Sequence, residues 1–319
     1  MSVVKIGVDV GNSDTKTQHC TIVSGYSKYN SKPDLATKIL AYEGAYYVPD
    51  ISERMPYVVD KTQNDQCLIL TLFGIAEELL YLAKESAESS QSSTQVELDK
   101  FDHIKLGIGL PPGHYKYAEK TVAYYDSKLR NKEVKFTYRN YSFSFFVDKV
   151  ELFPQDFVAV YKNPQSEIVK TQQYYILGIG GGTVDVIPIV NGIPEVNRCF
   201  SLELGTRVMY SQICADVQRQ YGFMPDESHI EAVLQGRGDE TVLSEDVKDL
   251  IRTDASLHFD TIINECIQNK VKVSLYPIVF FGGGALLFKE CINGSTKIAR
   301  SEIIGDVNAN AKAYAACLK

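Results

Sequence analysis

Residues 3–17 read VVKIGVDVGNSDTKT and contain the feature that decides the fold. The apolar run from Val3 to Val10 predicts a buried strand, yet it carries an acid, Asp9, close to its end. A glycine and a group of small polar residues follow. Small residues let the backbone N–H groups of such a turn approach an anion closely. The stretch therefore predicts a strand that leads into an anion-binding loop.

The residues of this first loop suit a phosphate group. The turn, the polar donors and a compact positive charge are supplied by Gly11, Asn12, Ser13, Asp14, Thr15 and Lys16. Asp9 would repel a phosphate unless a cation lay between them, so we expect Mg²⁺ held by Asp9 through water. An ordinary hairpin turn with an exposed acid explains the same residues, because one glycine turn is weak evidence, and this alternative stays open here. The spacing matches neither GxxxxGK[ST] nor GxGxxG.

Two further glycine elements follow apolar runs. Residues 174–190 read YYILGIGGGTVDVIPIV, in which Gly180, Gly181 and Gly182 allow close backbone approach and Thr183 adds a donor. The third element is GGGA, formed by Gly282, Gly283, Gly284 and Ala285 after the run 278–281. Its flat backbone suits a planar base. A glycine-rich hairpin and a plain strand-to-helix turn are the simpler alternatives for the two elements.

Composition limits the class of protein. The 319 residues suffice for two domains, and 45% apolar with 23% charged residues is typical of a folded chain. No apolar run approaches the roughly 18 residues of a membrane span, and the charged N-terminal run is no signal peptide. A net charge of −7 without a basic run disfavours direct nucleic-acid binding. Seven scattered cysteines without a CxxC pair indicate reduced thiols in the cytoplasm and disfavour a metal cluster.

Hydrophobic periodicity and turn residues give the remaining elements. Helices are predicted over 68–87, 115–130, 154–162, 244–268 and 306–316, and strands over 39–48, 103–110, 134–147, 150–153 and 278–281. Arg139 and Asn140 are predicted to form a hairpin turn. Pro154 is expected to begin a helix and Asp306 to cap the last one. Residues 88–100 are predicted to be an exposed loop.

Three strand–glycine elements in this order resemble the superfamily of actin, heat-shock chaperone ATPases and sugar kinases. Its five landmarks match residues 8–17, 152–161, 176–186, 280–287 and 306–316. The resemblance implies an α/β, actin-like fold with two ribonuclease-H-like domains around a nucleotide cleft. The first domain would combine residues 1–160 with 305–319, and the second would hold residues 161–304.

Within this superfamily the chain is most similar to the bacterial plasmid-segregation actins, the ParM or StbA group. GIGLPPGHY at 107–115 and FPQDFVAVY at 153–161 carry this resemblance, and the chain is too short for an added peptide-binding domain. The resemblance implies that Asp9 holds Mg²⁺, that the first loop binds phosphate through residues 11–15, and that Lys16 reaches the β- and γ-phosphates. Gln155 would orient the attacking water. Asp156 is expected to be an ordinary acid at a helix start.

One position departs from the family pattern. The second phosphate loop usually begins D-x-G-G-G-T, and here Gly178 occupies the place of that aspartate. The resemblance implies that this change removes one carboxylate from the metal and catalytic site, which Asp185 is expected to share with Asp9. Slower hydrolysis and a rearranged metal shell are both open.

The resemblance implies a cytoplasmic NTPase that uses ATP or GTP with Mg²⁺. Its subunits would join head to tail into filaments, and a DNA-binding adaptor protein would link them to plasmid DNA, with no membrane partner. Two alternatives remain, a cytoskeletal regulator that does not segregate DNA and a small-molecule kinase. A kinase needs an aspartate to accept a hydroxyl proton. The segment after the G-L-P stretch, PPGHYKY, offers His114 but no acid.

Overall fold

The computed structural model describes residues 3–56, 58–90, 98–163 and 165–319. They form two compact units: unit 1 holds residues 1–159 and 307–319, and unit 2 holds residues 160–306. The expected domain limits, after 160 and before 305, lie close to these bounds. The chain therefore leaves unit 1 once and returns to it with its last residues.

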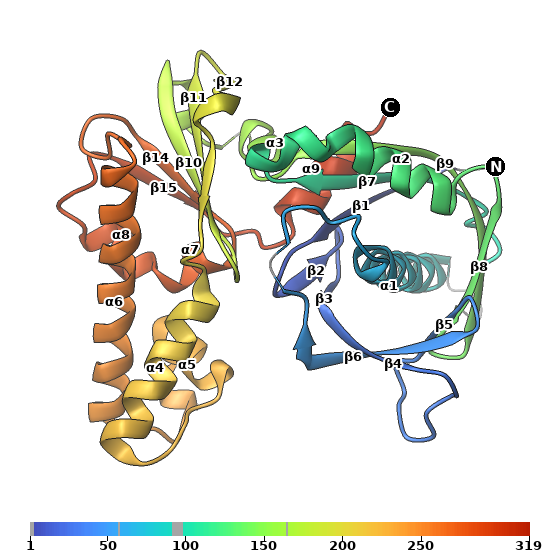
Figure 1. The fold of residues 1–319 in the computed structure, drawn as a ribbon, viewed down its shortest axis with the longest axis horizontal. Helices are drawn as coiled ribbons and strands as arrows, with labels where there is room; N and C mark the ends of the chain where they lie inside the picture. Colours follow the sequence, from blue (N-terminus) through green and yellow to red (C-terminus); the bar gives the residue numbers. More distant parts are fainter. Residues whose placement is uncertain (1–2, 57, 91–97, 164) are drawn as a thin grey trace. The chain divides into compact units, whose positions relative to one another are not determined.

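Unit 1 is built on a nine-stranded mixed sheet (Figure 1). In the order in which they pair, the strands are β3 (Thr21–Val23), β2 (Asp14–Lys16), β1 (Val4–Val10), β7 (His103–Leu110), β9 (Tyr141–Pro154), β8 (Glu133–Tyr138), β5 (Leu40–Tyr42), β6 (Ala45–Arg54) and β4 (Gly25–Tyr29). The neighbours β1, β7 and β9 are parallel. Their carboxyl ends therefore meet at one edge of the sheet, where ligands of open α/β sheets bind.

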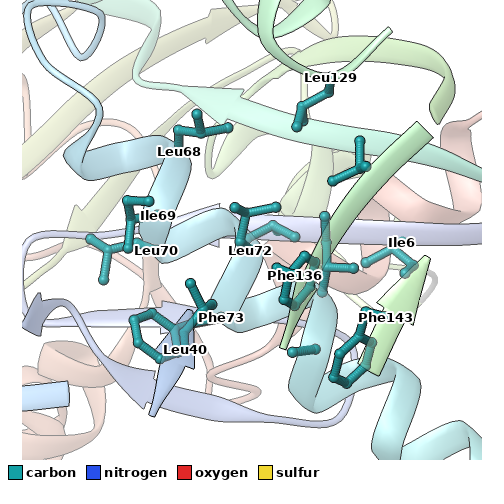
Figure 2. Packing of buried hydrophobic residues seen from close by; sticks show 14 of the residues in the cluster. Ile6, Leu40, Leu68, Ile69, Leu70, Leu72, Phe73, Leu129, Phe136 and Phe143 are labelled. Atoms are coloured by element: carbon teal, nitrogen blue, oxygen red, sulfur yellow. The ribbon is translucent and has the colours of Figure 1, made fainter. Parts of the chain in front are cut away.

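Helix α1 (Gln66–Ser90) fills the concave side of this sheet. Figure 2 shows Leu72 and Phe73 of α1 among core residues that include Leu40 and Phe136. Residues 66–88 are long and apolar enough to cross a membrane, with a mean hydropathy of 1.5, but 78% of that window is buried in the protein. Such burial is typical of the core helix of a folded domain, and Glu77 and Glu78 interrupt its apolar sequence.

Helix α9 (Ala309–Cys317) covers the opposite face of β1 and β7. A Cβ at Gly7 would lie 1.9 Å from the Ala311 carbonyl oxygen, whereas Val8, the next residue, contacts α1 at Gly74. Successive strand residues face opposite sides of a sheet, so the two helices sandwich β1. The glycines of β7 also admit α9, because a Cβ at Gly109 would lie 2.1 Å from the Tyr314 hydroxyl.

The region before the chain leaves unit 1 differs from its prediction. The strand expected at 150–153 is the end of a single strand, β9, which begins just after the predicted turn at Arg139 and Asn140. Pro154 is its last residue and begins no helix. The Gln155 N–H donates to the Leu110 carbonyl at 2.9 Å and extends the pairing with β7, so helix α3 starts only at Phe157 (Phe157–Tyr161).

Unit 2 contains a six-stranded sheet with helices α4 to α8. Its strands pair in the order β12 (Ile193–Pro194), β11 (Val184–Val190), β10 (Gln173–Ile179), β14 (Ile278–Phe281) and β15 (Ser301–Ile304), and β13 (Phe200–Leu202) also pairs with β11. The helices are α4 (Thr206–Tyr221), α5 (Glu227–Leu234), α6 (Glu245–Gln268), α7 (Gly283–Leu287) and α8 (Lys289–Gly294). Apolar residues of one face of β10 and β11 share a core with α4, α5 and α6.

The remaining elements follow the predictions with local differences. The predicted helix 115–130 is a 3₁₀ turn (Pro112–Tyr117) followed by α2 (Ala118–Leu129). The last helix starts after Asn308, so Asp306 is not its cap. The predicted strand 39–48 is a pair, β5 and β6, that turns at Glu43 and Gly44, and β6 continues past Pro49. The predicted loop 88–100 lies partly outside the described residues. All seven cysteines are free thiols, as expected.

Candidate functional site

The first loop is a tight turn between β1 and β2. The Gly11 N–H donates to the Asp14 carbonyl at 3.1 Å, and a Cβ at Gly11 would lie 2.9 Å from the same oxygen. Position 11 therefore requires glycine. Asp9 is directly opposite Lys16 in the strand ladder. An acid and a base thus flank a compact loop at the carboxyl edge of the sheet.

Thr15 of the first loop is completely buried, and its hydroxyl forms a 2.8 Å hydrogen bond with the Ser24 hydroxyl. The Ser24 N–H also donates to the Ser13 carbonyl at 2.8 Å. In this structure the Thr15 hydroxyl holds the loop against the adjoining chain, and its contact with phosphate stays a prediction.

Asp9 belongs to a buried polar cluster with Asn310 of α9 and Asp156. The Asn310 side-chain amide donates to Asp9 Oδ2 at 3.1 Å and to Asp156 Oδ1 at 2.9 Å. Its carbonyl oxygen accepts the Asp156 N–H at 2.9 Å. The other Asp9 carboxylate oxygen, Oδ1, is buried without a hydrogen-bond partner. A buried anionic oxygen without a partner is costly, so the cluster is suited to an added donor or cation.

Gln155 lies at the end of β9, in the turn before α3 and not within a helix. Its backbone is fixed by hydrogen bonds to Leu110 and Phe157. Its side-chain oxygen, Oε1, is buried and has no hydrogen-bond partner. An amide oxygen of this kind can accept a hydrogen bond from a water molecule. Gln155 is thus adjacent in the chain to Asp156 and available for the predicted role.

Two basic residues add to this end of unit 1. The Lys61 ammonium donates to the Val10 carbonyl at 2.6 Å, next to Asp9. His114 is buried in the turn that follows β7, and burial lowers the pKa of its imidazole, with Lys61 and Lys116 adding to the effect. His114 is therefore a neutral residue at neutral pH. Lys61 supplies positive charge beside the loop that the sequence did not reveal.

In unit 2 the predicted second loop is a hairpin held by backbone contacts. The Gly180 N–H donates to the Thr183 carbonyl at 2.9 Å. The first N–H groups of α4, at Thr206 and Arg207, donate to the carbonyls of Gly180 and Gly181 at 3.0 Å each. A Cβ at Gly205 would lie 2.4 Å from the Gly181 carbonyl oxygen. The start of α4 is therefore fixed against the hairpin, which the sequence did not predict.

The GGGA element packs against the end of β10. Gly282 has a φ of 91°, and a Cβ at Gly284 would lie 2.3 Å from a side-chain carbon of Ile179. Gly283 has no atom within 4 Å of its Cβ position and can approach a ligand. Ala285 is completely buried in the core of unit 2, and its contact with a nucleotide stays a prediction.

Asp185 is opposite Gly178 in the β10–β11 ladder, and their side-chain positions share a face of the sheet. It is buried, and its carboxylate accepts a hydrogen bond from the Ser201 hydroxyl. Asp185 therefore lies on the same face of the sheet as Gly178, the position at which the family pattern has an aspartate. Among the described residues, no group of three or more His, Cys, Asp or Glu side chains gathers into a metal-binding set. The described residues therefore form no site that would surround a metal ion with three or more such side chains. Mg²⁺, however, commonly takes only one or two carboxylates.

Sequence reasoning did not identify four features: Asn310, Lys61, the Gly205–Thr206 pair, and the left-handed backbone conformation of Asp156. Asn310 gave a weak signal, as an amide in the alanine-rich segment DVNANAKAYAACLK. The Gly-Thr pair before a helix is a second such signal. Neither has meaning before the fold shows what it contacts.

Comparison with known proteins was made at the level of sequence and of structure. Residues 176–294 match the family model described as archaeal actin homologue, MreB-like, C-terminal. No curated protein matches the chain in sequence.

Solved structures match over nearly the full length. Ta0583, an archaeal actin homologue in complex with ADP, has 18% identity and a TM-score of 0.72, covering 99% of this chain and 98% of its own. A 15-stranded ParM filament from Clostridium botulinum has 16% identity and a TM-score of 0.65, with 99% of both chains covered. ParM from Bacillus thuringiensis with AMPPNP has 13% identity and a TM-score of 0.65, covering 99% of this chain and 97% of its own.

Proposed function

Because this chain has the actin-like fold, we propose that it is a nucleotide-dependent, filament-forming NTPase that segregates plasmid DNA in the cytoplasm through a DNA-bound adaptor. The fold agrees with the resemblance to the actin superfamily on which the sequence prediction rested. The nucleotide would be ATP or GTP with Mg²⁺. The glycine loops described above, in unit 1 and in unit 2, would supply its contacts.

The observation that carries the proposal is the buried, unpartnered Oδ1 of Asp9. It lies at the carboxyl edge of parallel strands, next to a loop that requires glycine. A carboxylate oxygen in this position fits Mg²⁺, which prefers oxygen ligands and retains several waters. When bound, Mg²⁺ would neutralise negative charge on the phosphates. Asp9 would hold it, and we propose that Asp185 contributes from unit 2.

Hydrolysis requires an oriented water. The unpartnered Gln155 Oε1 can accept a hydrogen bond from that water, while the backbone bonds to Leu110 and Phe157 fix the residue. Such positioning is the main contribution that a protein makes to phosphoryl transfer. Lys16 would contact the phosphates as a compact charge, and residues 11–14 and 180–183 would present backbone groups to them.

Support for assembly comes from the related structures. They include a ParM filament, the Alp12 filament and an AlfA filament bound to AMPPNP. Identities of 13–16% leave the surfaces of this chain free to differ. Self-assembly and the adaptor are therefore parts of the proposal that need direct tests.

The test is right-angle light scattering of the purified chain with Mg²⁺ after ATP or GTP is added, with pelleting and phosphate release on the same samples. We expect scattering to rise above a threshold concentration and to fall as phosphate appears. Nucleotide binding without assembly at any concentration would instead favour a small-molecule kinase or a non-filamentous regulator. Filaments that fail to stabilise a low-copy plasmid carrying the neighbouring genes would favour a cytoskeletal role without DNA segregation.

A further inference from the structure

Asp156 has an unusual backbone for a buried side chain. Its φ is 62°, in the left-handed region, and its side chain is only 5% exposed. Glycine, asparagine and aspartate tolerate this region best, and other residues in it are strained. Buried residues in such conformations cluster at functional sites, because the surrounding structure must hold them there. The observation raises the question of what this carboxylate is held for.

Asn310 is the residue that holds it. The amide of Asn310 makes two hydrogen bonds to Asp156, one to the backbone N–H and one to the carboxylate. The same amide nitrogen donates to Asp9. Two carboxylate oxygens therefore lie within hydrogen-bond distance of one nitrogen, which brings two like charges together.

The charge of Asp9 has no ion-pair partner among the described residues. Its Oδ2 accepts from Asn310, its Oδ1 has no partner, and the nearby Lys61 ammonium donates to the Val10 carbonyl. Tyr314 is completely buried nearby, and burial raises the pKa of its phenol, with the negative charges of Asp9 and Asp156 adding to the effect. Its hydroxyl has no hydrogen-bond partner. Two close carboxylates in such surroundings repel each other and are stabilised by a cation.

We propose that Asp156 is the second carboxylate of the divalent-cation site of unit 1, with Asn310 as the residue that positions both acids. The cation would bind beside Asp9 Oδ1, the buried oxygen that lacks a partner. Unit 1 thereby has two carboxylates at its site, whereas the second loop has Gly178 where the family pattern has an aspartate. The inference rests on the proposed function for the identity of the cation, but not for the arrangement of the acids.

The first experiment measures Mn²⁺ binding to the nucleotide-free chain by electron paramagnetic resonance, and thermal unfolding with and without Mn²⁺. Asp156→Asn keeps the shape and tolerates the left-handed backbone but removes the charge. We expect it to weaken Mn²⁺ binding at least about tenfold, a loss typical of disturbed metal sites. Without metal it should unfold at a higher temperature, because the repulsion from Asp9 is gone.

Asp239→Asn is the charge-matched control, since this side chain is fully exposed in unit 2. It should leave Mn²⁺ binding unchanged. A wild-type chain that binds no Mn²⁺, or an Asp156→Asn chain that binds it as the wild type does, would overturn the assignment. An Asp156→Asn chain that unfolds at a lower temperature without metal would show that the carboxylate is structural, and would overturn it too.

A second pair of variants separates positioning from stability. Asn310→Ala removes the shared amide, whereas Asn308→Ala removes bonds from the same end of α9 to the carbonyls of Thr17 and Cys20, at 2.7 and 3.1 Å. Both should lower the unfolding temperature. Only Asn310→Ala should also weaken Mn²⁺ binding. Equal Mn²⁺ affinity in the two variants would remove Asn310 from the site.

Nucleotide binding is measured on the same proteins, so that the two ideas fail separately. A chain that binds Mn²⁺ through Asp156 but binds no ATP or GTP would keep the inference and refute the proposed NTPase. A chain that binds nucleotide while Asp156→Asn leaves Mn²⁺ affinity intact would do the reverse.

Discussion

The candidate sites of the two units are built from different material. In unit 1 the candidate residues contribute side chains: two carboxylates, an amide and a glutamine at the carboxyl edge of the sheet. In unit 2 the candidate site is built from backbone: glycines at 205, 282 and 284 approach neighbouring atoms too closely for a side chain, whereas Gly180 and Gly283 leave room for one. At the candidate site of unit 1, substitutions that alter side-chain shape should therefore be tolerated better than substitutions that alter charge. At the candidate site of unit 2, substitutions that add side-chain volume should be tolerated least.

The largest effect should come from Gly205→Ala. The φ of Gly205 is −66°, which alanine adopts freely, so the new methyl group is opposed by its approach to backbone atoms of Gly181 and Gly182, at 2.4 and 2.5 Å. Because backbone must move, we expect a loss of about 3 kcal/mol or more in the free energy of unfolding, measured in urea. Gly283→Ala is the control, with no atom near its Cβ position, and should not destabilise the fold. Equal stability of both variants would refute the backbone account of unit 2.

Gln155→Ala tests the side-chain account of unit 1. We expect phosphate release to fall roughly 100-fold, because the attacking water loses its acceptor, while nucleotide affinity stays nearly the same. Single-turnover release and equilibrium binding distinguish the two quantities. Gln218→Ala, an exposed glutamine of α4, serves as the control. Unchanged release in Gln155→Ala would remove this residue from the mechanism.

Lys16→Ala should have a smaller effect than Gln155→Ala, and this effect should be on nucleotide binding. Loss of one charge that contacts phosphate is expected to weaken nucleotide affinity about tenfold, or about 1.4 kcal/mol, and to reduce its dependence on salt. Lys132→Ala, an exposed lysine after α2, removes the same charge elsewhere on unit 1. If both variants bind nucleotide equally well, the positive charge acts through the general field of the protein and not through contact.

The smallest effect concerns acids of unit 2 that lie outside its candidate site. Burial and the neighbouring charge of Asp216 raise the pKa of Asp254 to about 6, and Arg219 opposes this shift. The folded state therefore binds more protons than the unfolded state between the usual carboxyl pKa of 3.8 and 6, and stability falls as pH rises through this range.

Asp254→Asn should remove this penalty. Above pH 7 we expect it to stabilise the chain by roughly 1 kcal/mol, less than the full shift because solvent screens a partly exposed carboxyl. Near pH 4 the gain should disappear, which urea unfolding at both pH values would reveal. Asp249→Asn, an exposed acid on the same helix, is the control. A gain that is independent of pH would show that Asp254 is not the group that titrates.

The sequence predicted what depends on local pattern. The apolar run 278–281 is β14, and the run before GGGT is β10, because a buried strand needs only a short apolar stretch between turn residues. Arg139 and Asn140 form the expected turn, and both have positive φ, as two-residue hairpins require. The order of the glycine elements carried the family resemblance that implied the actin-like fold.

The sequence could not predict what depends on distant partners. Pro154 follows a local rule that favours a helix start, but pairing with β7 extends the strand through it. Thr15 has the right chemistry for phosphate, and only the fold shows that Ser24 takes its hydroxyl. Asp156 was interpreted as an ordinary acid because its partner, Asn310, is 154 residues away in the chain.

The return of the chain to unit 1 has a consequence for synthesis on the ribosome. Residues 160–306 are contiguous, so unit 2 is complete in the nascent chain before unit 1 is. The amide that contacts Asp9 follows it by 301 positions in the chain. During translation β1 and β7 therefore lack the helix that covers one of their faces until α9 is made, and the acids lack the group that positions them. The cation site that we propose would be complete only after residues 307–319 have been made.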